Sequence, residues 1–131
     1  MNWFKKAQRN NFHEKIGNTG IIRLYRGINH KFDENFDLAK SDAPIGYSTW
    51  TDNPHLARAY AGENGFVYKI DLPKDKLGES YIDEDGERPL FFNNGKAAGL
   101  NNITGNEYLV YHYHDYYGSH LISELKSSEL H

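Results

Sequence analysis

A carboxylate at the start of an apolar strand is the first feature of this sequence that could do chemistry. Residues 106–111 alternate as a β-strand does, and Glu107 shares one face with Leu109 and Tyr111. A glutamate in that place either lies at the exposed end of the strand or points into a cleft. In a cleft, a carboxylate can hydrogen-bond sugar hydroxyls and stabilise positive charge that grows on a sugar ring.

Arginine, hydroxyl and aromatic residues near two earlier predicted strands, 21–27 and 45–50, could join this carboxylate. Arg26 suits bidentate binding of a diphosphate. The hydroxyl and aromatic residues are Ser48, Thr49, Trp50 and Tyr60. Aromatic rings of this kind can stack on a flat heterocycle. Each residue also has an ordinary structural interpretation: the arginine in a surface ion pair, the hydroxyls in a turn that enters a helix, and the rings in the core.

The composition limits the class of protein. A chain of 131 residues suits one domain over 1–131, with residues 1–19 as an N-terminal helix or extension. Aromatic residues make up 15% of the chain, so rings should fill much of the core. A net charge of -3 gives no general basic field for nucleic acid. The absence of cysteine excludes disulfides, thiol nucleophiles and thiolate zinc sites.

The hydrophobic pattern contains no apolar run near the ~20 residues of a membrane span. The residues after Met1 include no apolar stretch of the kind that marks a secretory signal. We therefore expect a protein without a membrane partner, located in the cytoplasm of a producing, host or target cell.

Alternation and turn residues predict mostly antiparallel strands with a single confident helix. The expected strands are 21–27, 45–50, 66–72, 106–111 and an edge strand over 120–126, with short strands at 80–82 and 90–92. Asn53 or Asp52 should cap a helix that begins at Pro54 and ends at Gly62. The expected loops and turns are 28–44, 83–86, 93–95 and 99–102. This pattern predicts an α+β fold, mostly antiparallel, with two packed faces.

Three blocks of the chain together resemble the ADP-ribosyltransferase superfamily. Residues 24–27 look like its first-strand motif in the arginine form, and residues 46–61 look like its second motif with the helix that follows. Residues 98–111 are very similar to the catalytic-glutamate segment of the poly(ADP-ribose) polymerase branch. The order and approximate spacing of the blocks also fit. The resemblance runs from about residue 21 to residue 126, and the third block is the most specific.

The resemblance implies an ADP-ribosyltransferase-like α+β fold with few helices, in which two small antiparallel sheets form a cleft for NAD. NAD would be a co-substrate, and no metal is expected. Glu107 would be catalytic: it would bind the 2′-hydroxyl of the nicotinamide ribose and stabilise the oxocarbenium-like transition state. Arg26 would hold the phosphates or the adjacent ribose, and Gly27 would offer its backbone to the nicotinamide amide.

The remaining implied NAD-binding residues lie in the second block. Ser48 would support the nicotinamide ribose or orient Glu107. Thr49 or Trp50, together with Tyr60, would hold the nicotinamide ring. The resemblance departs from the family pattern at Gly105, because arginine-modifying members carry an acidic or amide residue two positions before the catalytic glutamate.

The function that these implications favour is mono-ADP-ribosyl transfer from NAD to a macromolecule, with a protein acceptor preferred to nucleic acid. A bacterial or phage effector or toxin would suit the size of the chain. Two alternatives stay open: an NAD glycohydrolase that uses water as the acceptor, and an inactive module of the same fold that blocks a partner protein.

Two further patterns have a weaker chemical interpretation. His112 and His114 have the spacing of a metal pair on one strand face, which a sheet surface also explains. Residues 83–87 are acidic like a calcium loop, but the ligand alternation is out of register, so we expect a solvated turn.

Overall fold

The computed structural model describes residues 20–33, 46–84, 86–112 and 121–126. The helix or extension predicted for residues 1–19 and most of the loop predicted for 28–44 lie outside the described residues. Within these limits, no helix is long and apolar enough to cross a membrane.

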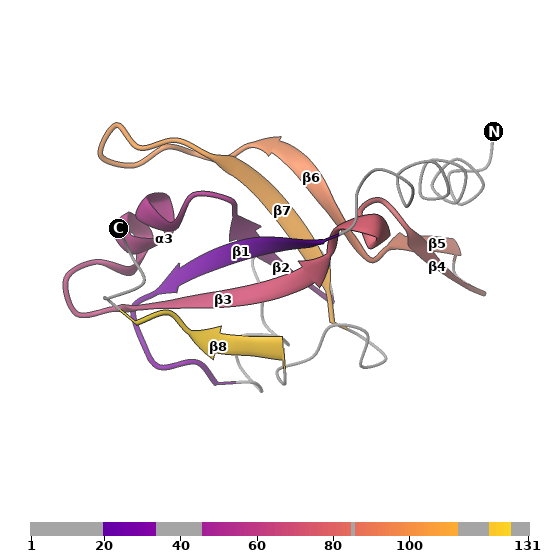
Figure 1. Cartoon of the computed structure of the whole chain (residues 1–131), viewed down its shortest axis with the longest axis horizontal. Coiled ribbons are helices and arrows are strands. Elements are labelled where there is room, and N and C mark those ends of the chain that lie inside the picture. The colour runs from indigo at the N-terminus through magenta and orange to yellow at the C-terminus, as the bar shows by residue number, and fades with distance from the viewer. Residues whose placement is uncertain (1–19, 34–45, 85, 113–120, 127–131) are drawn as a thin grey trace.

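Eight strands, one α-helix and one short 3-10 helix make up the described part of the chain (Figure 1). They are β1 (Ile21–Ile28), β2 (Tyr47–Thr51), α3 (Pro54–Ala61), β3 (Phe66–Pro73), η1 (Lys74–Lys76), β4 (Ser80–Asp83), β5 (Gly86–Pro89), β6 (Phe91–Lys96), β7 (Asn106–Tyr111) and β8 (Ile122–Glu124). The prediction of mostly antiparallel strands with few helices is confirmed for these residues, and β8 is an edge strand as expected.

Six strands form one antiparallel sheet in the order β6-β7-β2-β1-β3-β8, and β4 with β5 forms a separate hairpin. The predicted pair of small sheets is not confirmed in that form. However, β1 and β2 meet through the register pair of Tyr25 and Thr51, whereas β1 pairs with β3 over its full length. The sheet therefore consists of two three-stranded halves with a short junction, and in Figure 1 β6 and β7 turn away from β1 and β3.

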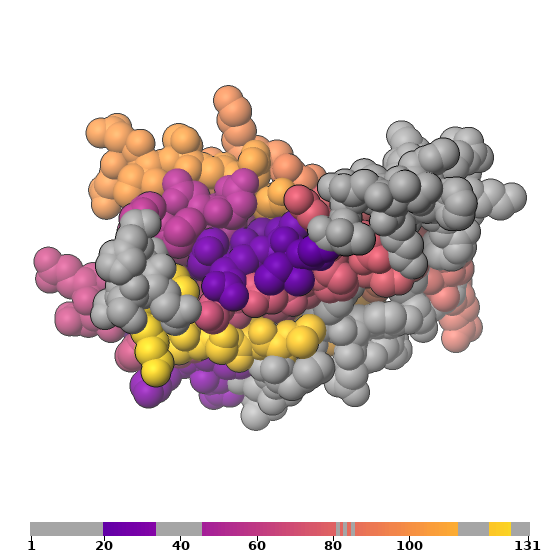
Figure 2. Space-filling model, viewed as in Figure 1, coloured from indigo at the N-terminus to yellow at the C-terminus, as the bar shows by residue number. Residues whose placement is uncertain are grey.

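The two faces of the sheet are covered differently. Gly27 and Val67 are register partners on one face, where α3 packs with Ala57 on this pair of strands. Leu24 and Ile70 point to the opposite face and have no exposed surface. Most of the larger core cluster lies on that second face, and it is rich in rings as the composition predicted. In Figure 2 the surface of α3 lies between β1 and the orange strands β6 and β7.

The start of α3 follows the prediction. Asn53 is the N-cap: its side-chain oxygen accepts a hydrogen bond from the backbone N–H of His55, at 3.0 Å. Pro54 occupies the first turn, where a missing N–H is tolerated. Gly62 ends the helix with a positive φ of 76°. The same Asn53 side chain donates to the carbonyl of Thr104, at 2.8 Å, and so ties the helix start to the segment before β7.

We expect Asn53→Ala to lower the free energy of unfolding by about 1 kcal/mol, because it removes the cap of α3. Asn53→Asp is the matched control, since it keeps the cap acceptor and loses only the donor to Thr104. Urea unfolding of the two variants should place Asn53→Asp between Asn53→Ala and the wild type. Equal losses in both variants would contradict the capping role.

Between residues 83 and 97 the turn predicted at 83–86 is confirmed, because Asp83 and Gly86 pair at the ends of β4 and β5. The loop predicted at 93–95 was wrong, and one strand was not predicted. Residues 86–89 form β5, which the sequence pattern did not indicate, and residues 93–95 lie inside β6. The register of β6 with β7 shifts between Asn93 and Lys96, and Gly95 has a φ of 98°. The Asn93 side chain accepts a hydrogen bond from the N–H of Gly95, at 2.8 Å. The Asn-Asn-Gly stretch therefore makes a bulge in an exposed edge strand rather than a turn.

Candidate functional site

Glu107 lies near the junction of the two halves of the sheet. It is the register partner of Thr51, which in turn pairs with Tyr25, so these three residues form one row across β7, β2 and β1. Partners in an antiparallel pair point to the same face, so Glu107 shares the face that carries α3. Its side chain is half-buried, and among the described residues its carboxylate makes no hydrogen bond or ion pair. This carboxylate is therefore available to a ligand.

Arg26 and Thr49, both among the residues proposed from the sequence, are joined by hydrogen bonds. The Arg26 guanidinium donates from Nη1 to the Thr49 carbonyl oxygen at 2.8 Å and to the Thr49 hydroxyl at 3.2 Å. Both residues are half-buried. Because Arg26 belongs to β1 and Thr49 to β2, this contact links the two halves beyond the pair of Tyr25 and Thr51. A cation is thereby held at a fixed place beside the junction.

Ser48 and Trp50 lie on the opposite face from Glu107. Their exposed fractions are 0% and 3%, and Trp50 Nε1 donates to the Ser48 hydroxyl at 2.6 Å. That hydroxyl also forms a short hydrogen bond with Nε2 of the buried His112. The strand pairing places Thr51, and not Ser48, opposite Glu107. The structure therefore does not bring Ser48 or Trp50 to Glu107, and both side chains are used in the core.

Gly27 packs against α3 from β1, and Tyr60 belongs to the last turn of α3. A Cβ atom built on Gly27 would lie 1.7 Å from the carbonyl oxygen of Ala57, so close packing of the helix on β1 explains this glycine. Tyr60 keeps 45% of its surface exposed, and its hydroxyl donates to the carbonyl of Ala98. Tyr60 thus joins the helix to the segment between β6 and β7, and its ring remains open to a ligand.

The sequence did not indicate that Asp52 has a partner in β7. The sequence predicts Asp52 only as an alternative helix cap, and the cap is Asn53. Asp52 Oδ1 accepts the backbone N–H of Asn106, and Asp52 Oδ2 accepts the Asn106 side-chain amide, both at 2.9 Å. The sequence signal that could have indicated this contact is the position of Asp52 directly after the last residue of β2.

Gly105 has a packing reason that bears on its place two residues before Glu107. A Cβ atom there would lie 2.8 Å from the Thr51 hydroxyl and 3.0 Å from Asp52 Oδ1. A side chain at this position would require the side chains of Thr51 and Asp52 to shift. Close packing against Thr51 and Asp52 is thus a structural reason for a glycine at position 105.

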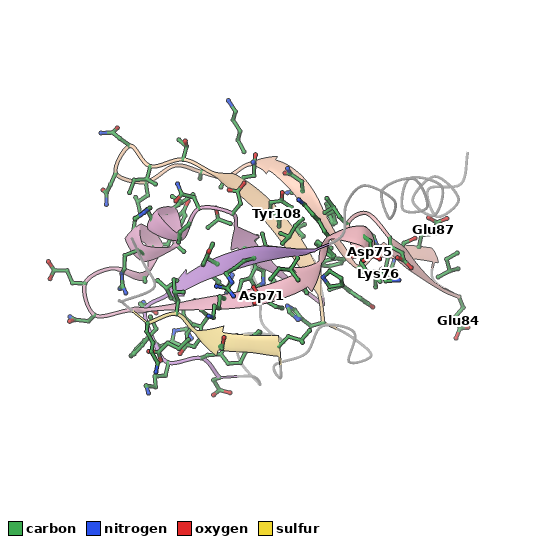
Figure 3. All side chains as sticks on the ribbon, in the orientation of Figure 1. Asp71, Asp75, Lys76, Glu84, Glu87 and Tyr108 are labelled. Atoms are coloured by element: carbon green, nitrogen blue, oxygen red, sulfur yellow. The ribbon has the colours of Figure 1, made fainter. Side chains whose placement is uncertain are left out.

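The weaker metal patterns find no support among the described residues. No group of three or more histidine, aspartate or glutamate side chains gathers there. His112 is bonded to Ser48, and His114 lies outside the described part. The acidic turn joins β4 to β5, where Glu84 is exposed. Figure 3 shows Glu84 and Glu87 on that hairpin, apart from the strand that carries Tyr108.

Two tyrosines, one on β2 and one on β7, have shifted pKa values. Burial raises the pKa of Tyr47 to about 12, and nearby Tyr111 adds to the rise while Arg88 opposes it. The Tyr47 hydroxyl donates to the carbonyl of Pro89, at 2.6 Å. Burial also raises the pKa of Tyr108, with a further contribution from the Asp52 carboxylate. Both rings are thus held neutral to higher pH than free tyrosine.

The shift of Tyr47 predicts a specific alkaline loss of stability. The pKa of Tyr47 is higher in the folded state than in the unfolded chain. The contribution of the neutral Tyr47 side chain to the free energy of unfolding is therefore complete below pH 10 and is lost as pH increases from 10 to about 12. We expect the loss to be on the order of 2 kcal/mol. Urea unfolding across this range should show the wild type and Tyr47→Phe converging, since the variant lacks the titrating group. Parallel curves would contradict the assignment.

Comparison of the chain with models of known protein families, with curated proteins and with solved structures finds no match.

Proposed function

We propose that this protein is an NAD-dependent mono-ADP-ribosyltransferase and that Glu107 is its catalytic carboxylate. The observation that carries the proposal is the half-buried Glu107 side chain, uncommitted among the described residues, in the segment most similar to a catalytic-glutamate segment. Its place supports this choice: the carboxylate shares a row with Thr51 at the junction. Arg26 alternates to the other face of β1, but its guanidinium reaches the hydroxyl of Thr49, which lies on the same face of β2 as Thr51. A carboxylate and a cation there suit a substrate with a ribose and a diphosphate.

The proposed reaction breaks one bond and makes one. The bond between the ribose C1′ and the nicotinamide nitrogen breaks, nicotinamide leaves with the electron pair, and positive charge grows on the ribose ring. The Glu107 carboxylate accepts a hydrogen bond from the 2′-hydroxyl and stabilises that charge. A nucleophilic atom of the acceptor then bonds to C1′ and gives up its proton to solvent water. The rate is therefore expected to depend on charge and position rather than on a covalent enzyme intermediate.

The other residues of the proposed site divide into two groups. Arg26 is proposed to bind the diphosphate or the adjacent ribose, and the Tyr60 ring to stack on a flat ring of NAD, since each has the chemistry and Tyr60 has the exposure. Ser48 and Trp50 are proposed to act indirectly. Their hydrogen bond would stabilise β2, the strand in which Thr51 pairs with Glu107. A role as a bacterial or phage effector or toxin belongs to the same proposal.

The test uses NAD labelled on the adenine side, purified protein and a cell lysate as the source of acceptors. Nicotinamide is measured by liquid chromatography, and label is followed into protein and nucleic acid. Release of nicotinamide with label on protein supports the proposal. Release with label only in free ADP-ribose identifies an NAD glycohydrolase. Absence of release and of label overturns the enzymatic assignment and favours a binding module.

A further inference from the structure

A carboxylate on the corner between β2 and α3 holds the residue immediately before Glu107. Asp52 uses both oxygens on Asn106: Oδ1 accepts the backbone N–H and Oδ2 accepts the side-chain amide, each at 2.9 Å. The backbone N–H of Asp52 donates in return to the Asn106 carbonyl, at 3.4 Å. Asn106 is thus fixed from three sides, through its amide, its carbonyl and its side chain.

Neighbouring contacts fix the same short segment. The Asn53 side chain donates to the carbonyl of Thr104, at 2.8 Å. Gly105 lies so close to this corner that an added Cβ atom would meet the Thr51 hydroxyl at 2.8 Å. The start of β7 is therefore set against the β2–α3 corner, and not only by its pairing within the sheet.

We propose that Asp52 is a positioning residue that sets the orientation of the Glu107 carboxylate in the transition state. The proposal rests on the proposed function of Glu107. Because Asn106 and Glu107 are consecutive, a rotation of the backbone at Asn106 moves the Glu107 side chain directly. Among the described residues the Glu107 carboxylate makes no hydrogen bond that would hold it in place. Its orientation is thus controlled through the backbone, which Asp52 holds.

The first variant breaks the Asp52–Asn106 pair without changing its size, and the second breaks it by truncation. Asn106→Asp opposes two carboxylates and breaks the contact, and we expect kcat for nicotinamide release to fall about tenfold or more. KM for NAD should change by less than about twofold, because the loss is confined to the transition state. Asp52→Ala breaks the contact with the opposite change of charge, and it should lower kcat in the same way.

The double variant Asp52→Asn with Asn106→Asp restores both hydrogen bonds and the wild-type net charge. The backbone N–H of residue 106 still donates to the side-chain oxygen at position 52, and donor and acceptor are exchanged only between the two side chains. We expect its kcat to return to within about twofold of the wild type. Asp71→Asn is the control, since it weakens a similar two-point contact, with Arg23, in the other half of the sheet. Its kcat should equal that of the wild type.

Hydrogen exchange of the Asn106 amide gives a readout that needs no activity. In Asn106→Asp and Asp52→Ala the amide at position 106 should exchange at least about tenfold faster, and the double variant should recover protection. If the wild type is active and kcat is unchanged in both Asn106→Asp and Asp52→Ala, the positioning role alone is overturned. Unchanged hydrogen exchange at the amide of residue 106 in these two variants overturns it as well. A wild type that releases no nicotinamide overturns the proposed function, and with it the role of Asp52 in catalysis.

Discussion

Replacing Glu107 by glutamine is expected to lower the rate of nicotinamide release from NAD by about 100-fold or more, which corresponds to roughly 3 kcal/mol of transition-state stabilisation. Glutamine has nearly the same size and can still accept a hydrogen bond from a ribose hydroxyl. It lacks the negative charge that would stabilise the oxocarbenium-like ribose. The loss should therefore appear in kcat more than in KM for NAD.

The stability of Glu107→Gln should remain that of the wild type, because among the described residues the carboxylate has no hydrogen bond or ion pair to lose. Glu124→Gln is a matched control: it removes an exposed carboxylate from the edge strand β8 of the same sheet and should leave the rate unchanged. Equal rates for wild type and Glu107→Gln would remove Glu107 as the catalyst. A large loss of stability in Glu107→Gln would instead indicate a structural carboxylate.

Replacing Gly27 by alanine is expected to lower the free energy of unfolding by about 3 kcal/mol, at the upper end of the range for overpacking a well-packed contact. The added Cβ atom would lie 1.7 Å from the carbonyl oxygen of Ala57 and 2.9 Å from the backbone nitrogen of Ala61. These are backbone atoms of α3, so no side chain can turn aside to make room. The helix must move away from β1 or the strand must bend.

Ile21→Ala provides the comparison for Gly27→Ala within the same strand. Ile21 is 59% exposed at the start of β1, and its truncation should cost less than about 1 kcal/mol. Both variants can be measured by urea unfolding with circular dichroism. A Gly27→Ala protein as stable as Ile21→Ala would mean that α3 does not pack on β1 at this distance.

Sequence alone predicted those helices and strands in which capping residues, strand-favouring residues and the pattern of burial all indicate the same structure. The N-cap of α3 and its proline in the first turn are local chemistry, and β1, β3 and β7 are rich in residues that favour strands. The stretch that became β5 and β6 was harder. It is largely exposed, so it lacks a clear alternation, and the glycine of its bulge resembles the glycine of a turn.

The candidate site was predicted in part, for a reason that concerns strand register. Arg26 and Thr49 do meet, and Glu107 has an accessible carboxylate. Ser48 does not reach it, because Glu107 pairs with Thr51, three residues farther along β2. An odd offset along a strand reverses the face on which a side chain lies. A single sequence does not reveal that offset, so residue type and the resemblance of the second block selected Ser48.

The short junction within the six-stranded sheet has a consequence for cooperativity. The chain passes from one half to the other between β1 and β2, between β2 and β3, between β3 and β6, and between β7 and β8. Neither half is therefore a continuous piece of chain, and no single cut can release one of them as a folded fragment. Few backbone hydrogen bonds join the two halves directly. We nevertheless expect the halves to unfold together, because four chain connections cross between them.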